Sequence, residues 1–271
     1  MQDLRPPAVA GTFYPLQPSV LSGNIHALMG AASVLVAPGA PVPKAVIVPH
    51  AGYIYSGSTA ALAYARLAPA HVSIRRVVLL GPVHRVAVRG LALPGARSFS
   101  TPLGAVAVDQ EAVAAISGLR QVVVSSAVHA QEHSLEVQLP FLQSVLDEFT
   151  LVPLAVGDAT AEEVAEVLNL LWGGPETLIV ISSDLSHYLP YSQAQAVDEN
   201  TVQRILDLTG GISHSQACGG TPVNGLLLAA QQHHLRPELL GLCNSGDTAG
   251  DKSRVVGYAA LALTGATHAT A

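Results

Sequence analysis

Five apolar runs of strand length recur along the chain and constrain its fold more than any other feature. They are AVIVP (45–49), RVVLLGP (76–82), LVPLAV (151–156), TLIVIS (177–182) and RVVGYAALAL (254–263). Continuous runs of Val, Ile and Leu are typical of strands that are covered on both faces. Helix-like segments lie between them, at 58–68, 109–117, 133–149, 160–172, 192–208 and 221–233. This alternation predicts a layered α/β sheet.

Shorter segments refine this prediction. The stretches 90–95, 99–109 and 119–126 have the character of short strands or hairpins. We therefore expect one α/β/α domain over residues 1–271, with a mixed, mostly parallel central sheet. Two local signals are also readable: Thr160 and Glu163 form a capping box, and Pro140 should kink or break the helix predicted at 133–149.

The composition excludes several classes of protein. Only 12% of residues are charged, the net charge is −6 and no basic run occurs, so we expect no nucleic-acid partner. Pro, Gly and polar residues interrupt the uncharged stretches 20–43 and 255–271, which argues against a membrane span. The first 15 residues do not have the pattern of a signal peptide, and the two cysteines form no disulfide framework. We expect a soluble cytoplasmic protein.

Polar side chains follow three of the predicted strands. His50 follows the run 45–49, His84 follows 76–82, and Asp184 and His187 follow 177–182. The first two runs and the helix between them read as one βαβ unit with parallel strands. The carboxyl ends of parallel strands form the edge at which open α/β sheets bind ligands. The four side chains are therefore predicted to share one site.

Imidazoles and carboxylates that converge in this way suit a divalent metal such as iron or zinc. Two histidines and one acid form the ligand set of many non-haem Fe(II) oxygenases. The residues alone leave the third ligand open, because the glycine-rich stretch 243–253 offers Cys243, Asp247 and Asp251.

Other polar residues have two readings each. Asp184 either faces a metal or caps a turn. His133 and Glu136 lie near a helix start, where they would line the pocket or hydrogen-bond to its loops. Tyr53 would offer its hydroxyl to a substrate or to a metal ligand, or pack as a buried ring. Cys218 has the setting of a small buried residue rather than a nucleophile.

Six motifs occur together in a recognisable order. They are RPPAVAGTFYP (5–15), VPHAGYIYSG (48–57), LLGPVH (79–84), EHSLEVQLPFLQ (132–143), ISSDLSHY (181–188) and SGDTAGDKSRVVGYAALAL (245–263). In this combination the chain resembles, over nearly its whole length, the Memo-like family, called AmmeMemoRadiSam system protein B in prokaryotes. That family is similar to class III extradiol dioxygenases, which are non-haem iron enzymes with a mixed α/β fold.

The resemblance implies roles for four residues. His50 and His84 match the family's metal-binding histidines. Asp184 and His187 match a polar pair that faces the metal, and His187 matches the acid/base of the dioxygenases.

The third ligand is where this chain departs from the family. In the animal Memo protein it is a cysteine, whose position falls on Thr248 here. Because a neutral hydroxyl binds iron weakly, we expect the neighbouring Asp247 to take this role, with Cys243 as a less suitable substitute. A carboxylate and a thiolate prefer different metals, so zinc and copper are alternatives to Fe(II).

The resemblance therefore implies an iron-binding, dioxygenase-like oxidoreductase that acts with a radical-SAM protein and a third component of the same system. A small molecule or a peptide would occupy the metal cleft. Two other functions stay open: a binding module that uses the cleft without turnover, and a zinc-dependent hydrolase. Whether the protein is an enzyme is thus not decided by the sequence.

Overall fold

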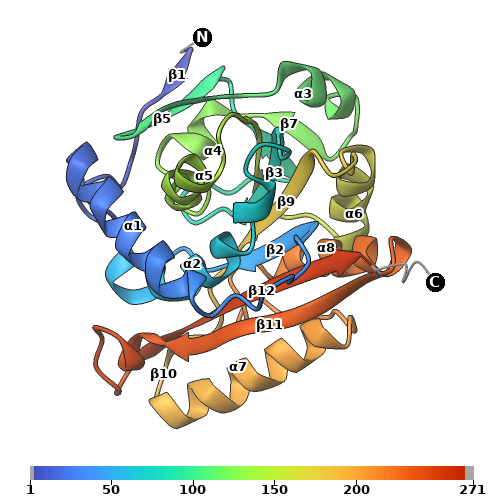
Figure 1. The fold of residues 1–271 in the computed structure, drawn as a ribbon. Helices are drawn as coiled ribbons and strands as arrows, with labels where there is room; N and C mark the ends of the chain where they lie inside the picture. The colour runs from blue at the N-terminus through green and yellow to red at the C-terminus, as the bar shows by residue number, and fades with distance from the viewer. Residues whose placement is uncertain (1–2, 266–271) are drawn as a thin grey trace.

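A nine-stranded mixed sheet forms the centre of the molecule in this computed structural model, which describes residues 3–265 (Figure 1). The strand order is β10-β12-β2-β9-β3-β8-β4-β7, and β11 pairs with β12 beside this path. Four neighbouring strands are parallel: β2 (Ala45–Val48), β9 (Thr177–Ser182), β3 (Arg76–Pro82) and β8 (Thr150–Val156). Each coincides with one of the predicted apolar runs.

The remaining strands make the sheet mixed. β12 (Val255–Gly265) runs antiparallel to β2, and β4 (Leu91–Leu93) runs antiparallel to β8. The other members of the sheet are β7 (Val122–Val124), β10 (His187–Leu189) and β11 (Leu235–Asn244). A separate three-stranded sheet is formed by β1 (Leu4–Arg5), β5 (Ser98–Thr101) and β6 (Gly104–Ala107). The predicted mixed, mostly parallel centre is confirmed.

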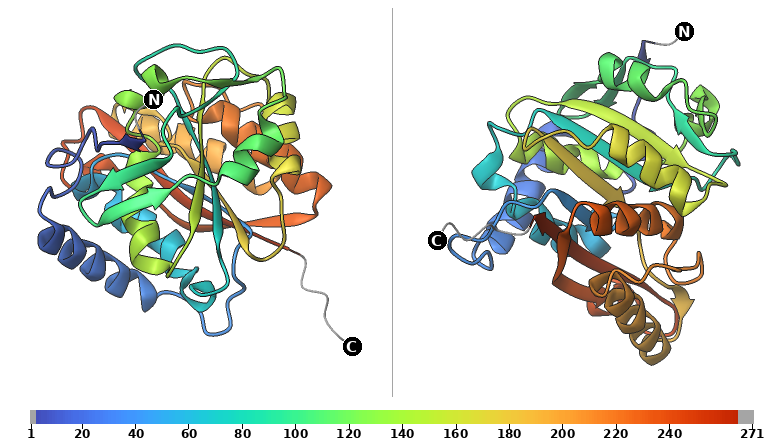
Figure 2. Two further views of the ribbon diagram at one scale, coloured as in Figure 1. Left: turned by 90° about the horizontal axis from the view of Figure 1, so that it is seen from above. Right: turned by 90° about the vertical axis from the view of Figure 1, so that its right-hand side faces the viewer.

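Helices cover both faces of the central sheet (Figures 1 and 2). One apolar core holds α1 (Pro18–Ser33), α2 (Tyr53–Ala65) and α5 (Leu139–Val145) against the sheet. The opposite core holds α3 (Gln110–Ile116), α6 (Ala161–Leu170), α7 (Tyr191–Leu206) and α8 (Gly220–Gln232). Alternation along β2 shows the two sides, because Val46 and Val48 join the first core while Ala45 and Ile47 join the second. The α/β/α layering is therefore as predicted.

The short helices occur at loops and turns: α4 (Ser126–Ala130), η1 (Ala68–Ala70), η2 (Glu136–Gln138) and η3 (Ser245–Asp247). The segment predicted as a helix at 133–149 is divided into η2 and α5, and Pro140 lies in the first turn of α5, where its missing N–H costs little. The capping box predicted at the start of α6 is present, with Thr160 and Glu163 bonded to each other's backbone N–H.

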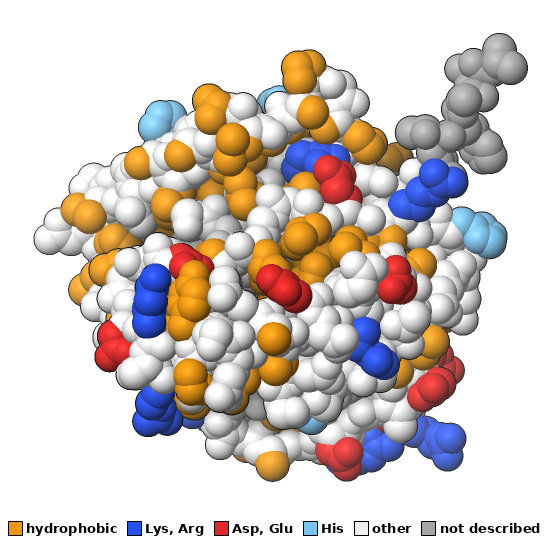
Figure 3. Space-filling model, turned by 90° about the horizontal axis from the view of Figure 1, so that it is seen from below, with side chains coloured by type: hydrophobic (Ala, Val, Ile, Leu, Met, Phe, Trp, Pro, Cys, Tyr) orange, Lys and Arg blue, Asp and Glu red, His pale blue; other side chains and the backbone are white. Residues whose placement is uncertain are grey.

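The surface carries few charges. On the lower face, apolar side chains gather in the middle and charged ones are scattered around them (Figure 3). Exposed large apolar residues of the described chain include Val34, Leu35, Leu239 and Leu242. None of the described helices combines the length and the apolar character that crossing a membrane requires.

Candidate metal centre

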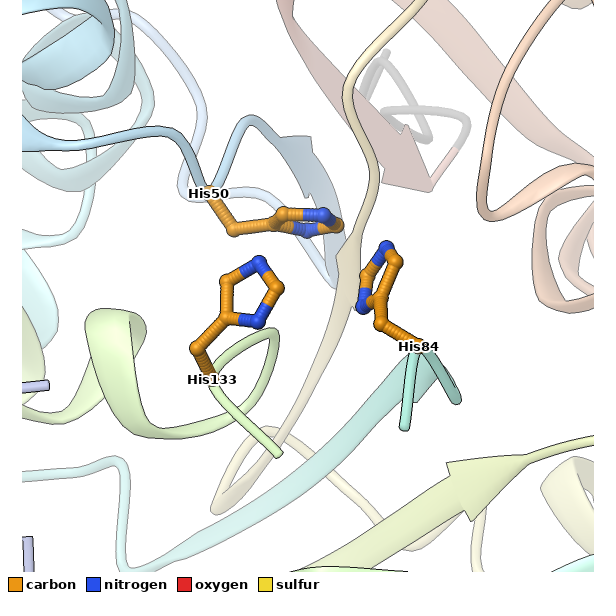
Figure 4. Close-up of side chains that lie close together, drawn as sticks. All are labelled: His50, His84 and His133. Atoms are coloured by element: carbon orange, nitrogen blue, oxygen red, sulfur yellow. The ribbon is translucent and has the colours of Figure 1, made fainter. Parts of the chain in front are cut away.

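Three imidazoles converge at the carboxyl-terminal edge of the parallel strands. His50 follows β2, His84 follows β3, and His133 lies in the loop before η2. One ligand nitrogen of each lies within 4.8 Å of the other two, and the rings point toward one another (Figure 4). Because β9 lies between β2 and β3, the first two histidines approach each other across its end. This spacing suits three nitrogen ligands around one metal ion.

The hydrogen bonds of His50 fix its tautomer. The Ser182 hydroxyl donates to the carbonyl of Ser134 and accepts from the Gln138 side chain. Its remaining lone pair faces Nδ1 of His50 at 2.9 Å, so Nδ1 must carry the proton. The lone pair of Nε2 is then available to a metal. Such a partner on the far nitrogen is the usual way in which proteins orient a metal-binding histidine.

Glu132 fixes the tautomer of His84. Its carboxylate can only accept, so Nδ1 of His84, at 2.9 Å from Oε1, is the donor and Nε2 keeps its lone pair. The same carboxylate accepts the backbone N–H groups of His84, His133 and Ser134. One buried carboxylate therefore ties the loops that carry two of the three histidines.

His133 is held between this carboxylate and an aromatic ring. Its Nδ1 lies 3.5 Å from Oε1 of Glu132, and the ring of Phe13 packs against its imidazole with centroids 4.8 Å apart. Phe13 belongs to the N-terminal segment, whose backbone carbonyl at this residue accepts the N–H of Tyr53. Contacts from distant parts of the chain thus set the position of His133.

Electrostatics favour a bound cation. Burial, followed by the neighbouring histidines, lowers the pKa of His50 well below its ordinary value. Burial lowers the pKa of His133 to about 4. Burial raises the pKa of Glu132, but the hydrogen bonds from His84 and from backbone N–H groups outweigh it and bring the value to about 2. At neutral pH His50 and His133 are therefore uncharged and Glu132 is ionised, which is the protonation state that metal binding needs.

Asp184 and His187 lie beside the three histidines. Oδ1 of Asp184 accepts the backbone N–H of His50 at 2.7 Å, and burial raises the pKa of this carboxyl. Nδ1 of His187 donates to the carbonyl of Leu185 at 2.8 Å, which leaves Nε2 free to accept a proton. Both residues line the pocket that also contains His133.

Two pockets open on either side of this centre. One, of about 730 Å³, is lined by His84 and by mainly apolar groups of β10 and α7; the other, of about 450 Å³, is lined by His133 and Asp184. His187 and Tyr188 line both pockets. A molecule bound at the metal centre therefore has room in two directions.

Asp247, predicted as the third ligand, is not brought into the histidine group. Its carboxylate accepts the Tyr191 hydroxyl at 2.5 Å and the backbone N–H of Asn244 at 3.0 Å, which caps the turn η3. It lines a different pocket, together with Cys243 and Thr248. The structure therefore groups His133, and not Asp247, with His50 and His84.

The two alternatives to Asp247 are also engaged elsewhere. Sγ of Cys243 lies 3.0 Å from the Thr59 hydroxyl, and the Thr248 hydroxyl donates to the carbonyl of Ser245. Asp251, also considered, accepts the N–H of Ser253 at an exposed turn.

Tyr53 and Glu136 lie behind the centre and line neither of its pockets. Tyr53 donates to the carbonyl of Val137 at 2.8 Å and packs against Phe141, so it is a buried packing residue. Glu136 accepts hydrogen bonds from the N-terminal segment: from the Arg5 guanidinium, the Tyr14 hydroxyl and the backbone N–H groups of residues 8 and 9.

Three residues that contact the histidines were not predicted from the sequence to do so: Glu132, Ser182 and Cys218. Sγ of Cys218 lies 3.4 Å from Nε2 of His50, and burial raises the pKa of this thiol to about 12. Glu132 directly precedes His133 and Ser182 is the last residue of β9, but no sequence pattern marks either of them as the partner of an imidazole nitrogen.

Comparison with known proteins gives a consistent result. The family model described as "Memo-like protein" matches residues 5–262. A MEMO1 family protein of Methanosarcina barkeri is 36% identical over 95% of this chain and 99% of its own length. MEMO1 family proteins of Aquifex aeolicus and Methanopyrus kandleri are 36% and 38% identical, over 94% and 95% of this chain and 97% and 98% of their own lengths.

Proposed function

The chain belongs to the Memo-like protein family, and we propose that it is a non-haem, dioxygenase-like oxidoreductase that binds Fe(II) on His50, His84 and His133. The family resemblance also supports a role beside a radical-SAM protein in a modification pathway. The observation that carries the proposal is the convergence of three imidazoles whose ligand nitrogens lie within 4.8 Å of one another.

The side chains present fit a divalent transition metal. Hydrogen bonds to Ser182 and Glu132 direct the free lone pairs of His50 and His84 toward the centre. Imidazole nitrogens are good ligands for iron, zinc and copper. Magnesium and calcium prefer oxygen ligands, so they fit this centre less well. His84 is the most exposed of the three and lines the larger pocket, so the centre is open to exchange with a substrate.

Iron(II), when bound, would supply electrons to dioxygen and polarise an oxygen of the substrate. The protein's own groups would handle protons and position. Nε2 of His187 faces two pockets with no hydrogen-bond partner among the described residues, so it can take a proton from a substrate hydroxyl and return it later. Asp184 holds the backbone of His50 and thereby fixes the approach of this ligand.

Oxygen uptake tests this proposal. Protein loaded with Fe(II) under anaerobic conditions is mixed with aerated buffer and 3,4-dihydroxybenzoate or catechol as probe diols. We expect oxygen consumption above that of free iron, and loss of it in His187→Ala although this variant keeps its metal. Equal consumption by wild type and His187→Ala would contradict the proposed proton transfer, and absence of consumption with every diol would contradict the oxidoreductase.

The ligand set also supports a second candidate. Three histidines and an open position form the donor set of catalytic zinc in some hydrolytic and hydrating enzymes. A zinc-dependent hydrolase would bind Zn²⁺ in preference to iron and cleave an activated ester without oxygen. Hydrolysis of p-nitrophenyl acetate by the zinc-loaded protein, lost in His133→Ala, would favour this candidate over the first.

A further inference from the structure

The pocket beside His133 has a cationic side chain at its rim. Arg254, which directly precedes β12, lines this cavity of about 450 Å³ together with hydroxyl-bearing residues, among them Tyr55, Tyr258 and Ser245. The Arg254 side chain is exposed. No described carboxylate forms an ion pair with it, whereas six other arginines have an acidic partner. The N–H groups of this guanidinium are therefore available to bind an anion at a pocket that also contains His133.

Tyr188 orients this arginine. The guanidinium carbon lies 5.0 Å from the centroid of the Tyr188 ring, a cation–π distance. Tyr188 itself has φ of +61°, in the left-handed region that residues with a side chain rarely adopt. Backbone of this kind is concentrated at ligand-binding sites. Here His187 and Tyr188 line both pockets, and the Tyr188 ring packs against the guanidinium.

The polar groups of the pocket are graded along its length. Asp184 is buried and accepts the backbone N–H of His50, so it marks the inner end, whereas Arg254 is exposed and marks the outer end. The buried Asp184 carboxyl would repel an anionic group at the inner end. A planar guanidinium fork binds a carboxylate or a phosphate through two parallel hydrogen bonds. A molecule with one anionic end is thereby oriented, with its hydroxyl-bearing end toward the metal centre.

We propose that the substrate is a small molecule with a carboxylate or phosphate group, and that Arg254 binds this group in the pocket beside His133. The proposal deepens the proposed function, because it assumes that the molecule held there is the one that reacts at the histidines. The binding step itself depends only on Arg254 and the pocket, so it can be tested in protein stripped of metal.

The test compares a charged probe with its uncharged isostere. Binding of benzoate, phenyl phosphate and benzamide to chelator-treated protein is measured by calorimetry and by saturation-transfer NMR at pH 7.5. We expect benzoate and phenyl phosphate to bind about tenfold or more tightly than benzamide, since hydrogen bonds to a charged group are lost with the amide. Stronger binding of one anion than the other identifies whether the natural group is a carboxylate or a phosphate.

Arg254→Met is expected to remove this preference, because it keeps the apolar stem and loses the guanidinium. Arg236→Met is the matched control, since Arg236 is an exposed arginine of β11 that lines neither pocket of the centre. An equal affinity for benzamide and benzoate in the wild type, or a preference that survives in Arg254→Met, would overturn the proposal. If the anion preference holds while the protein binds no metal, the proposed function fails and the anion site stands.

Discussion

A single carboxylate, Glu132, organises the candidate centre at the scale of residues. It accepts a hydrogen bond from Nδ1 of His84 and from three backbone N–H groups around His84 and His133. Residues that orient metal ligands in this way usually change metal affinity by about 10–100-fold when they are replaced. We therefore expect Glu132→Gln to bind metal about 10–100-fold more weakly.

A competition titration with a chromophoric chelator measures this effect. Glu162→Gln is the control, because Glu162 is an exposed acid in the first turn of α6. An unchanged affinity in Glu132→Gln would show that the carboxylate holds the loops without acting on the ligands.

A second acid makes the stability of the protein depend on pH. Asp198 is buried and accepts the N–H of Ser186, and burial raises its pKa to about 6. Since this pKa is higher in the folded than in the unfolded chain, its contribution to stability is fully present below the ordinary value of 3.8 and is lost as the pH rises through 6. The charge of His187 acts in the opposite direction and lowers the pKa of Asp198, but burial outweighs it.

Asp198→Asn mimics the protonated acid and removes this loss. We expect the variant to be more stable than wild type at pH 7.5, by about 2 kcal/mol, and equal to it near pH 3. Denaturant unfolding at the two pH values measures the difference. A variant that is less stable than wild type at both pH values would show that the charged carboxylate contributes favourably.

The residues of the site differ in how far the sequence predicts their places. His50 and His84 follow buried parallel strands directly, so strand order alone brings them to one edge. His133 lies in a loop whose path depends on the Glu132 carboxylate and on Phe13, and neither contact has a sequence pattern. Asp247 was predicted as the third ligand, but its carboxylate accepts hydrogen bonds from Tyr191 of α7 and from the N–H of Asn244, and it lies outside the histidine group.

At the scale of elements, the N-terminal segment is the part that braces the centre from behind. Arg5 of β1 donates to Glu136 of η2 and to the backbone carbonyls of His129 and Glu132, and all of these groups are buried. Removing one partner of a buried ion pair leaves the other charge without compensation. We therefore expect Arg5→Ala to lower the free energy of unfolding by about 3 kcal/mol.

Arg75→Ala is the matched control, because Arg75 and Glu148 form an ion pair on the exposed surface. Such pairs contribute little to the free energy of unfolding. Urea unfolding of both variants measures the contrast. Similar losses in the two variants would contradict the bracing role of Arg5.

The elements that were predicted and those that were not differ in burial. The parallel strands are buried on both faces, which produces the uninterrupted apolar runs seen in the sequence. β11 is half exposed and contains Pro237 and Gly241, so its sequence lacks both a continuous run and a clean alternation. α1 contains two glycines and no charged residue, and its few buried positions, Leu21, Ile25 and Ala32, are a weak helical signal.

At the scale of the whole molecule, the sheet topology places the centre. β9 follows β8 in the sequence but lies between β2 and β3 in the sheet, whereas β8 lies on the other side of β3. The carboxyl ends of these strands meet at one edge, where two pockets of 730 and 450 Å³ flank the histidines. This is where open α/β sheets bind ligands, and it explains why residues far apart in sequence share one site.

The central claim is that His50, His84 and His133 hold one metal ion. Elemental analysis after anaerobic purification tests it most directly, on wild type, on the three single alanine variants and on Asp247→Asn as control. We predict about one iron per chain in wild type and in Asp247→Asn, and loss of the metal in each histidine variant. Metal that persists in His133→Ala and disappears in Asp247→Asn, or a wild type that binds none after reconstitution, would contradict the account.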